Sequence, residues 1–324
     1  MNHPLDDDHL PVVRASDITE TVTGPRWMIE SLWARAGVGI LGGAPKCCKS
    51  WTALEMALAV TSGAPFLGDF PTHDRGPALL YMAEDAAPLV KARLSGICRH
   101  RGLLLHELEL HLITAAALRL DRSGDQSRLR DAIDRYKPRL LVLDPFVRLH
   151  RIDENDAGQV SALLGYLREL QREYDVAIMV VHHARKNGGS QPGQSLRGSG
   201  DFFAWADSLL HVHRHRGQLI LTVEHRNAPA PQPINLRLAG DHDVHLEVQS
   251  SHPCNPAEPD PQDALDTSII DALTAAAQPM PRADLRQSLH VRNKRLGDAL
   301  LRLAQAGRVL QIGNRWSIPE THTP

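Results

Sequence analysis

One segment, residues 37–63, constrains the fold of this chain more than any other. It opens with the apolar run VGIL, continues through a loop rich in Gly and Pro, and ends in a mostly apolar stretch. In that stretch Trp51, Leu54 and Leu58 recur at helical spacing. The segment therefore predicts a buried strand, a tight loop and a helix in direct succession.

The loop reads GAPKCCKS and fits the phosphate-loop pattern GxxxxGK(S/T), except that a cysteine replaces the second glycine. Backbone N–H groups of such a loop, together with the N-terminus of the following helix, surround phosphate oxygens. Lys49 would reach the β- and γ-phosphates and Ser50 a Mg²⁺ ion. A Gly-rich turn before a core helix is the alternative, but it does not explain Lys and Ser at the start of an apolar helix. The predicted nucleotide site consists of Gly43, Ala44, Pro45, Lys46, Cys47, Cys48, Lys49, Ser50 and Trp51.

Cys48 puts the turnover rate in question. A side chain at this position crowds the phosphates or requires backbone angles that glycine adopts more readily. Weakened nucleotide binding and a site without turnover are both consistent with it, and the sequence leaves them open.

Two carboxylates follow other strand-like runs. Asp144 ends the run LLVLD, and ligands of open α/β sheets bind at the carboxyl ends of the strands. Its carboxylate can hold Mg²⁺ there, with an ordinary Asp-Pro turn as the alternative. Glu84 follows the run ALLYMA and can orient and deprotonate an attacking water. Asp85, beside it, suits the N-cap of a following helix better.

The strand-like runs predict the fold class. Those at 78–83, 140–143 and 176–181 are almost wholly apolar, as strands buried on both faces of a parallel sheet are. Helical or mixed segments separate them, which indicates an α/β domain. After residue 207 the runs alternate between apolar and polar residues, and this predicts an antiparallel extension of the sheet.

The length of the chain, 324 residues, exceeds what one compact core usually holds, so a large and a small domain are expected. A stretch rich in proline and polar residues marks the linker between them. The predicted divisions are a flexible tail over 1–20, the α/β domain over 21–249, the linker over 250–263 and the small domain over 264–320.

Composition excludes several classes of protein. No run of about 18 apolar residues is present to span a bilayer, so we expect no membrane partner. The N-terminal MNHPLDDDHL lacks the layout of a secretory signal, which predicts a cytoplasmic protein. Four cysteines without a CxxC pair predict reduced thiols rather than disulfides or a zinc site. The net charge of -2 supplies no global basic field, so binding to nucleic acid depends on local charge.

The run VVHHARK places His182 and His183 at the end of a predicted strand. Adjacent histidines suggest a metal, but no nearby carboxylate or Cys pattern completes a site. We therefore favour a γ-phosphate sensor over a metal ligand or a structural role. Arg185, Lys186 and Arg197 make the Gly-rich loop that follows positive. Such a loop suits a nucleic-acid backbone or a neighbouring subunit, and equally a solvated surface.

Several motifs together carry a family resemblance: GAPKCCKSW, YMAED, LLVLDPF, ENDA at 154–157, VVHHARK and LRGSGD. They resemble the RepA-like branch of the RecA-fold P-loop ATPases, within the AAA family of ATPases. This branch is known from hexameric plasmid replicative helicases and their phage and chromosomal relatives. The resemblance covers about residues 27–248 and implies a RecA-like core with ATP bound between the subunits of a ring. Most members have glycine where this chain has Cys48.

The resemblance also implies a role for each motif residue. Lys49 and Ser50 would bind the phosphates and Mg²⁺. Glu84 would be the catalytic base, Asp144 the Walker B acid and His182 the sensor. An arginine from the adjacent subunit completes such sites, and the candidates are Arg214, Arg216 and Arg197.

Residues 265–319 resemble a winged helix-turn-helix domain. Apolar residues at helical spacing predict three helices, and RVLQIGNRWSI predicts a two-stranded wing. The segment from Arg282 to Arg315 contains eight basic residues and only two acidic ones. A recognition helix opening at residues 292–295 would present cations to phosphates and an amide to base edges, whereas a protein-docking module is the alternative. The DNA-binding candidates are Arg185, Lys186, Arg292, Asn293, Lys294, Arg295 and Arg315.

Three functional hypotheses follow. The first is a Mg²⁺-dependent ATPase, by resemblance a hexameric ring of identical subunits, that couples hydrolysis to movement on DNA or to its remodelling. The second is an ATP-switched winged-helix regulator with slow or absent hydrolysis, which Cys48 keeps open. The third is a protein-remodelling ATPase whose winged helix docks a partner. Stimulation of ATP turnover by DNA separates the first from the other two.

Overall fold

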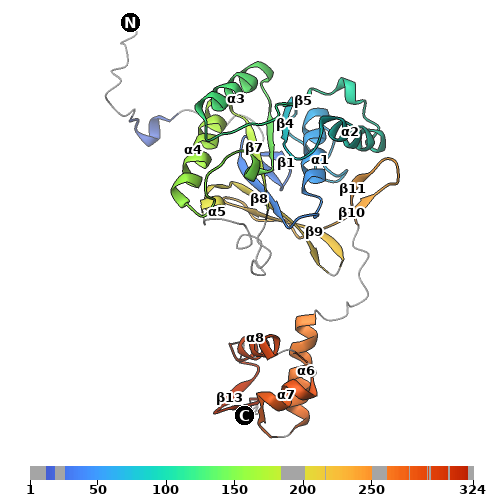
Figure 1. Ribbon diagram of the computed structural model, residues 1–324, viewed down its shortest axis with the longest axis vertical. Helices are drawn as coiled ribbons and strands as arrows, with labels where there is room; N and C mark the ends of the chain where they lie inside the picture. Colours follow the sequence, from blue (N-terminus) through green and yellow to red (C-terminus); the bar gives the residue numbers. More distant parts are fainter. Residues whose placement is uncertain are drawn as a thin grey trace. The chain divides into compact units, whose positions relative to one another are not determined.

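Two units, residues 1–250 and 251–324, enclose hydrophobic cores of their own (Figure 1). No helix in the part of the chain described below is long and apolar enough to cross a membrane. The computed structural model describes residues 12–18, 26–183, 201–215, 217–249, 261–276, 278–289, 291, 293–305 and 307–319.

The first unit is built on one nine-stranded sheet. Its strands are β3 Val38–Gly43, β4 Ala78–Met82, β5 Leu110–Leu112, β6 Leu140–Asp144, β7 Ala177–His183, β8 Ser208–His215, β9 Gln218–His225, β10 Ile234–Ala239 and β11 His245–Val248. They run in the order β11-β10-β9-β8-β3-β7-β6-β4-β5. Neighbours from β8 to β5 pair in parallel, whereas β9, β10 and β11 pair antiparallel. The prediction of a mostly parallel sheet with an antiparallel extension is confirmed.

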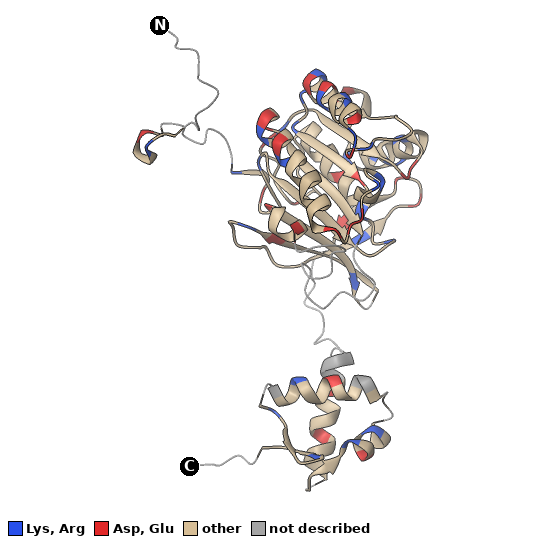
Figure 2. Cartoon of the chain, turned by 60° about the vertical axis from the view of Figure 1, so that its left-hand side comes forward, with Lys and Arg blue, Asp and Glu red and all other residues tan. Residues whose placement is uncertain are grey.

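Helices cover both faces of this sheet (Figure 1). One face packs against α1 Lys49–Ser62 and α2 Ala87–Arg101, and the other against α3 Ser123–Tyr136, α4 Ala157–Tyr174 and α5 Asp201–Trp205. The central strands are therefore buried on both sides, which explains their apolar sequences. Acidic and basic residues are mixed along the outer helices (Figure 2), as in the ion pair of Arg128 with Asp125.

The remaining elements of the first unit are short. They are η1 Ala15–Asp17, β1 Trp27–Ile29, β2 Trp33–Ala34, η2 Leu105–Glu107 and η3 Phe146–Arg148. The strands β1 and β2 form a small antiparallel sheet. Its fully buried Trp33 packs in the same core cluster as α1, so this small sheet extends the core.

A buried ion pair joins α1 to α2 and to the antiparallel extension. Glu55 of α1 is 2% exposed, and its Oε2 accepts from the Arg101 guanidinium at 3.0 Å. Its Oε1 accepts from the backbone N–H of Leu246 in β11 at 2.9 Å. Burial raises the pKa of the Glu55 carboxyl, while the Arg101 charge opposes that rise. Both carboxylate oxygens have partners, which limits the cost of burying the charge.

The second unit contains three helices and a three-stranded antiparallel sheet. Its elements are α6 Pro261–Ala275, β12 Met280–Pro281, α7 Arg282–Ser288, α8 Asn293–Gln305, β13 Leu310–Ile312 and β14 Arg315–Ser317. The sheet order is β12-β14-β13, so β12 pairs with the hairpin β13-β14. Apolar side chains from all three helices and from Trp316 make its core.

Candidate functional site

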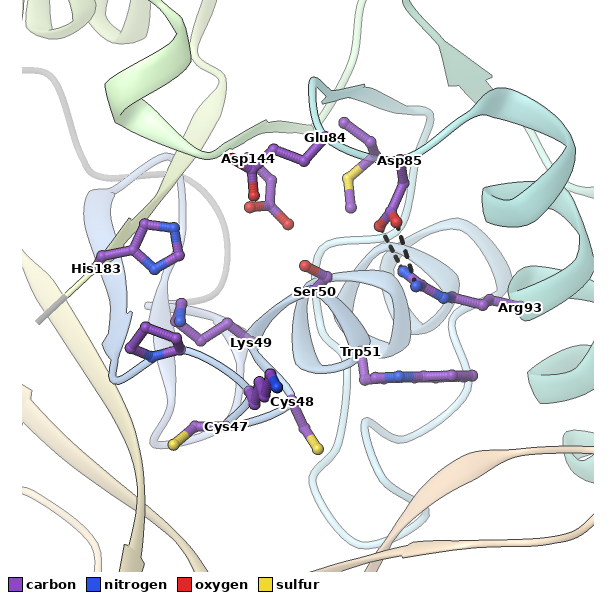
Figure 3. Close-up of a pocket in the computed structure, with 13 residues that line it drawn as sticks. Cys47, Cys48, Lys49, Ser50, Trp51, Glu84, Asp85, Arg93, Asp144 and His183 are labelled. Atoms are coloured by element: carbon purple, nitrogen blue, oxygen red, sulfur yellow. Dashed lines mark hydrogen bonds and ion pairs between the residues drawn. The ribbon is translucent and has the colours of Figure 1, made fainter.

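A cavity of about 360 Å³ lies at the carboxyl ends of the central parallel strands (Figure 3). The strand register explains why these ends meet, because Gly43 of β3 lies beside His183 of β7 and Met82 of β4 beside Asp144 of β6. The loop after β3, the first turn of α1 and a part of α2 complete the wall. The lining residues are Pro45, Lys46, Cys47, Cys48, Lys49, Ser50, Trp51, Met82, Glu84, Asp85, Arg93, Asp144 and His183.

The backbone of the loop is shaped for a close approach. A Cβ atom on Gly43 would lie 2.2 Å from the carbonyl oxygen of Val212, so a side chain there would collide with β8. Lys46 and Cys48 adopt positive φ angles of 65° and 59°. The first turn of α1 follows directly, and Cys48 makes no side-chain cap hydrogen bond to it. The first N–H groups of a helix without such a cap are suited to binding phosphate oxygens.

Cys48 stands in the left-handed region, with φ 59° and ψ 25°. This conformation costs a residue with a Cβ about 1 kcal/mol more than glycine. Burial raises the pKa of its thiol, and the nearby Arg214 guanidinium partly opposes that rise. The thiol also lines the cavity. Of the two consequences considered for a side chain here, the strained backbone is therefore present, and crowding of phosphates stays a prediction.

The Lys49 ammonium folds back onto its own loop. Its Nζ donates to the carbonyl oxygens of Gly43 at 3.0 Å and of Ala44 at 2.9 Å. Burial lowers the pKa of Lys49, and the negative charges of Asp144 and Glu84 oppose that effect. The loop thus holds the Lys49 ammonium through its own carbonyl oxygens, in the wall of the cavity.

Asp144 and Ser50 form the part of the cavity that fits a hard cation. Asp144 is 7% exposed, and it borders the cavity together with Ser50, whose hydroxyl acts to lower the pKa of the Asp144 carboxyl. Among the described residues, none donates a hydrogen bond to its buried Oδ2. Burial raises the pKa of Asp144 to about 6, with Asp85 and Glu84 adding to the rise. A hydroxyl and a carboxylate with one oxygen that lacks a hydrogen-bond donor match the oxygen ligands that Mg²⁺ prefers.

Glu84 lies across the cavity from the loop, on the segment that follows β4 (Figure 3). Its Oε1 accepts from Arg148 Nε at 3.0 Å, and the two side chains are 46% and 60% exposed. Arg148 ends η3, just after β6, and this contact fixes the direction of the carboxylate. Sequence reasoning did not find Arg148, because no motif joins it to residue 84 across the sheet.

Asp85 does not cap α2, contrary to the sequence expectation. The N-cap is Ala86, and Asp85 instead accepts two hydrogen bonds from Arg93, at 2.5 Å and 3.2 Å. The Arg93 guanidinium lies 5.4 Å from the centre of the Trp51 ring. Arg93 can reach Asp85 because it lies eight residues further along the chain, about two turns into α2. This platform of Trp51 and Arg93 borders the cavity (Figure 3), and nothing in the sequence pattern indicated it.

The two adjacent histidines point to opposite faces of the sheet. His183 lines the cavity, whereas His182 is 3% exposed and lies in the other face, 3.7 Å from Glu154. The structure thus keeps His182, the expected phosphate sensor, away from this cavity and places His183 at it. Alternation along β7 is the reason, since Met179 and Val181 share the α1 face with His183. That parity is readable from the sequence.

The acidic motif at 154–157 has two roles in the structure. Asp156 caps α4 by accepting from the backbone N–H groups of Gly158 and Gln159. The hydrogen bond from the Gln159 side chain, and after it these backbone bonds, lower the pKa of its carboxyl. Glu154 lies 3.6 Å from His150 and also approaches the buried His182. The motif therefore supports the sheet from the face opposite the cavity.

The other predicted residues are dispersed or lie outside the described part of the chain. Arg214 is exposed near the end of β8, beside Cys48 of its own loop, which does not favour a finger reaching a neighbouring subunit. Asn293 and Arg315 are exposed in the second unit, where Arg315 donates to Pro279 O at 3.3 Å. Outside the description lie Arg185, Lys186, Arg197, Arg216 and Arg292, and the side chains of Lys294 and Arg295.

Comparison with known proteins identifies the family. A model described as an AAA domain matches residues 4–189, which is more than half of the chain. The chain belongs to the AAA domain family. With the sheet topology above, this membership makes the first unit the RecA-like core of a P-loop ATPase, with a nucleotide as its ligand.

Two solved structures resemble this AAA domain protein. A KaiC-like protein from the hyperthermophilic archaeon Pyrococcus horikoshii OT3 shares 14% identity over 69% of this chain and 94% of its own, with a TM-score of 0.47. The RadB recombinase shares 16% identity over 67% of this chain and 92% of its own, with a TM-score of 0.48.

Proposed function

We propose that this chain is a Mg²⁺-dependent ATPase of the RepA-like branch that acts on DNA as a ring of identical subunits in the cytoplasm. The observation that carries the proposal is the convergence of one cation and three oxygen-bearing side chains in a single cavity. These are Lys49, Ser50, Glu84 and Asp144, each from a different position at the carboxyl edge of the sheet or the start of α1.

Each of these residues has a role that its surroundings support. Lys49 leaves the carbonyls of Gly43 and Ala44 and donates to the β- and γ-phosphate oxygens. Ser50 and Asp144 would hold Mg²⁺, which when bound supplies positive charge to the phosphates. Glu84, turned by Arg148, orients the attacking water and accepts its proton.

Two further groups complete the proposed site. His183 would contact the terminal phosphate in place of His182, because its side chain shares the cavity with Lys49 and Asp144. The loop residues 43–48 supply backbone N–H groups to the phosphates. An arginine from a neighbouring subunit remains part of the proposal, with Arg197 and Arg216 as candidates on sequence grounds.

The second unit is proposed to be a winged helix that contacts DNA. Its elements follow the order helix, strand, helix, helix, strand, strand, and β12 pairs with the hairpin as the first strand of a winged helix does. The sequence between Arg282 and Arg315 carries the excess of basic residues noted above. Its third helix, α8, opens with the exposed Asn293, which suits an approach to base edges.

ATP hydrolysis by the purified chain, with and without single- and double-stranded DNA, tests this proposal. We expect DNA to raise turnover several-fold, and Lys49→Ala to lower it at least about a hundredfold, because the phosphates lose their principal cation. Lys91→Ala removes an exposed lysine from α2 and serves as the matched control, with unchanged turnover. Turnover that persists in Lys49→Ala, or that DNA leaves unchanged, would contradict the motor.

The left-handed Cys48 favours one second candidate, an ATP-switched DNA-binding regulator with slow or absent hydrolysis. Tight ATP binding without turnover, together with ATP-dependent binding to selected DNA sites, would identify that switch. Non-selective DNA-stimulated hydrolysis would exclude it.

A further inference from the structure

Two histidines and a glutamate meet at the C-terminal end of α2, whereas the nucleotide cavity borders its N-terminal half. His100 belongs to the last turn of α2, and His245 and Glu247 lie two residues apart on β11. Within the described part of the chain, this group alone brings three potential ligand atoms within 4.8 Å of one another. The rings of His100 and His245 stack with their centroids 3.3 Å apart.

Both ring nitrogens of His245 face acceptor oxygens. Its Nδ1 lies 2.6 Å from the carbonyl oxygen of Asp243, which can only accept, so Nδ1 carries a proton. Its Nε2 lies 2.9 Å from Glu247 Oε1, another acceptor. Either a second proton or a metal ion must therefore stand between Nε2 and the carboxylate. Metal-binding histidines usually donate their other ring N–H to a backbone carbonyl in this way.

Neighbouring ion pairs hold the two sides of the cluster in place. Arg237 pairs with Glu247 Oε2 at 2.7 Å and leaves Oε1 turned toward His245. Arg99 pairs with Asp243 at 2.6 Å and so fixes the turn whose carbonyl receives the His245 proton. These contacts orient the donor atoms from outside, as the outer partners of a metal site do.

We propose that His100, His245 and Glu247 bind one divalent transition-metal ion of the Zn²⁺ type, which fastens the end of α2 to β11. Two imidazole nitrogens and one carboxylate oxygen are the donors that such ions prefer, at roughly 2.0–2.2 Å, with water in the fourth position. An imidazole nitrogen binds a metal in the plane of its ring, so His100 must turn out of its stack on His245, and its exposed position leaves room for that turn. The oxygen-only site at Ser50 and Asp144 selects Mg²⁺ instead, so the two sites differ in metal and in place.

Metal titration of the full chain, stripped with EDTA and kept reduced without nucleotide, tests this site. Calorimetry with Zn²⁺ is expected to show one saturable site, and bound Zn²⁺ to raise Tm because it stabilises the folded state. His100→Ala and Glu247→Gln should each weaken binding at least about tenfold. His106→Ala removes another exposed histidine nearby and is expected to bind as the wild type does.

Three outcomes would overturn the proposal. They are no saturable uptake up to about 100 µM Zn²⁺, equal affinity in wild type and His100→Ala, and uptake that vanishes in Cys48→Ser but survives in His100→Ala. The last would place the ion at the P-loop thiols. The titration needs no ATP turnover, so Lys49→Ala should bind Zn²⁺ unchanged, and the result is independent of the proposed ATPase function.

Discussion

The parallel half of the nine-stranded sheet and its antiparallel extension treat buried polar groups in opposite ways. At the carboxyl ends of the parallel strands, none of the described residues donates a hydrogen bond to Oδ2 of Asp144. Cys48, in the loop that follows β3, has a left-handed backbone conformation. Beside the extension, both oxygens of the buried Glu55 have partners on other elements. The first arrangement costs stability and leaves groups available to a ligand, whereas the second uses the same chemistry to hold elements together.

The largest effect is expected on the extension side. Glu55→Ala leaves the Arg101 charge and the Leu246 N–H without their partner, and should lower the free energy of unfolding by about 3 kcal/mol. Chemical denaturation measures the loss. Glu55→Gln keeps the shape and one acceptor, so a smaller loss is expected. An Ala variant as stable as the wild type would break the comparison, because the extension would then not depend on its buried pair.

The next effect separates the two faces of β7. His183→Ala should lower kcat by about a hundredfold, since a donor to the phosphates is lost, with little change in stability. His182→Ala is the matched control and should mainly lower stability, because it empties a buried position beside Glu154. Hydrolysis assays and thermal melts on both variants decide the matter. The reverse pattern would restore His182 as the sensor.

This pair also shows how far the sequence reaches. The parallel strands, the helices and the antiparallel extension follow from apolar periodicity, and those predictions are confirmed. Of the expected P-loop residues, those at 45–51 border one cavity with the carboxylates Glu84 and Asp144, and the chemical roles of all of them stay predictions. The sequence analysis chose His182 as the sensor, but His183 is the histidine that borders the cavity, and its alternation with Val181 along the strand indicates this. The Asp85 pair with Arg93 was not predictable, because it depends on how α2 packs after the strands are in place.

Replacement of Asp144, at the end of the parallel strand β6, should stabilise the protein. Burial raises the pKa of Asp144 to about 6, above its ordinary value. Stability is therefore lost as the pH rises from that ordinary value to about 6, and above this range the ionised carboxylate destabilises the fold. In EDTA and without nucleotide, Asp144→Asn should therefore raise the free energy of unfolding by about 2 kcal/mol at pH 8. The gain should shrink toward pH 4, where the wild-type carboxyl is protonated. A lower Tm for the variant at pH 8 would show a carboxylate already satisfied by its neighbours.

The smallest effect concerns the loop itself. Cys48→Gly removes the left-handed strain, offset in part by the greater freedom of glycine in the unfolded chain, for a net gain of about 0.5 kcal/mol. It also removes the thiol from the cavity, so ATP affinity or turnover should rise. Cys48→Ala removes the sulfur but keeps the strain. If Ala and Gly raise turnover equally, bulk is the cause; if neither changes turnover or stability, strain at this position has no weight.

The Lys49 contacts with Gly43 and Ala44 affect which anions can bind at the loop. The Lys49 ammonium already donates to two carbonyl oxygens, so an incoming anion must first displace them. A chloride or a single phosphate exchanges those contacts for few new ones. A nucleotide tail with several oxygens in a row can replace the carbonyls and also occupy the helix N-terminus and Ser50. We therefore expect the resting loop to bind chloride and inorganic phosphate more weakly than a nucleotide.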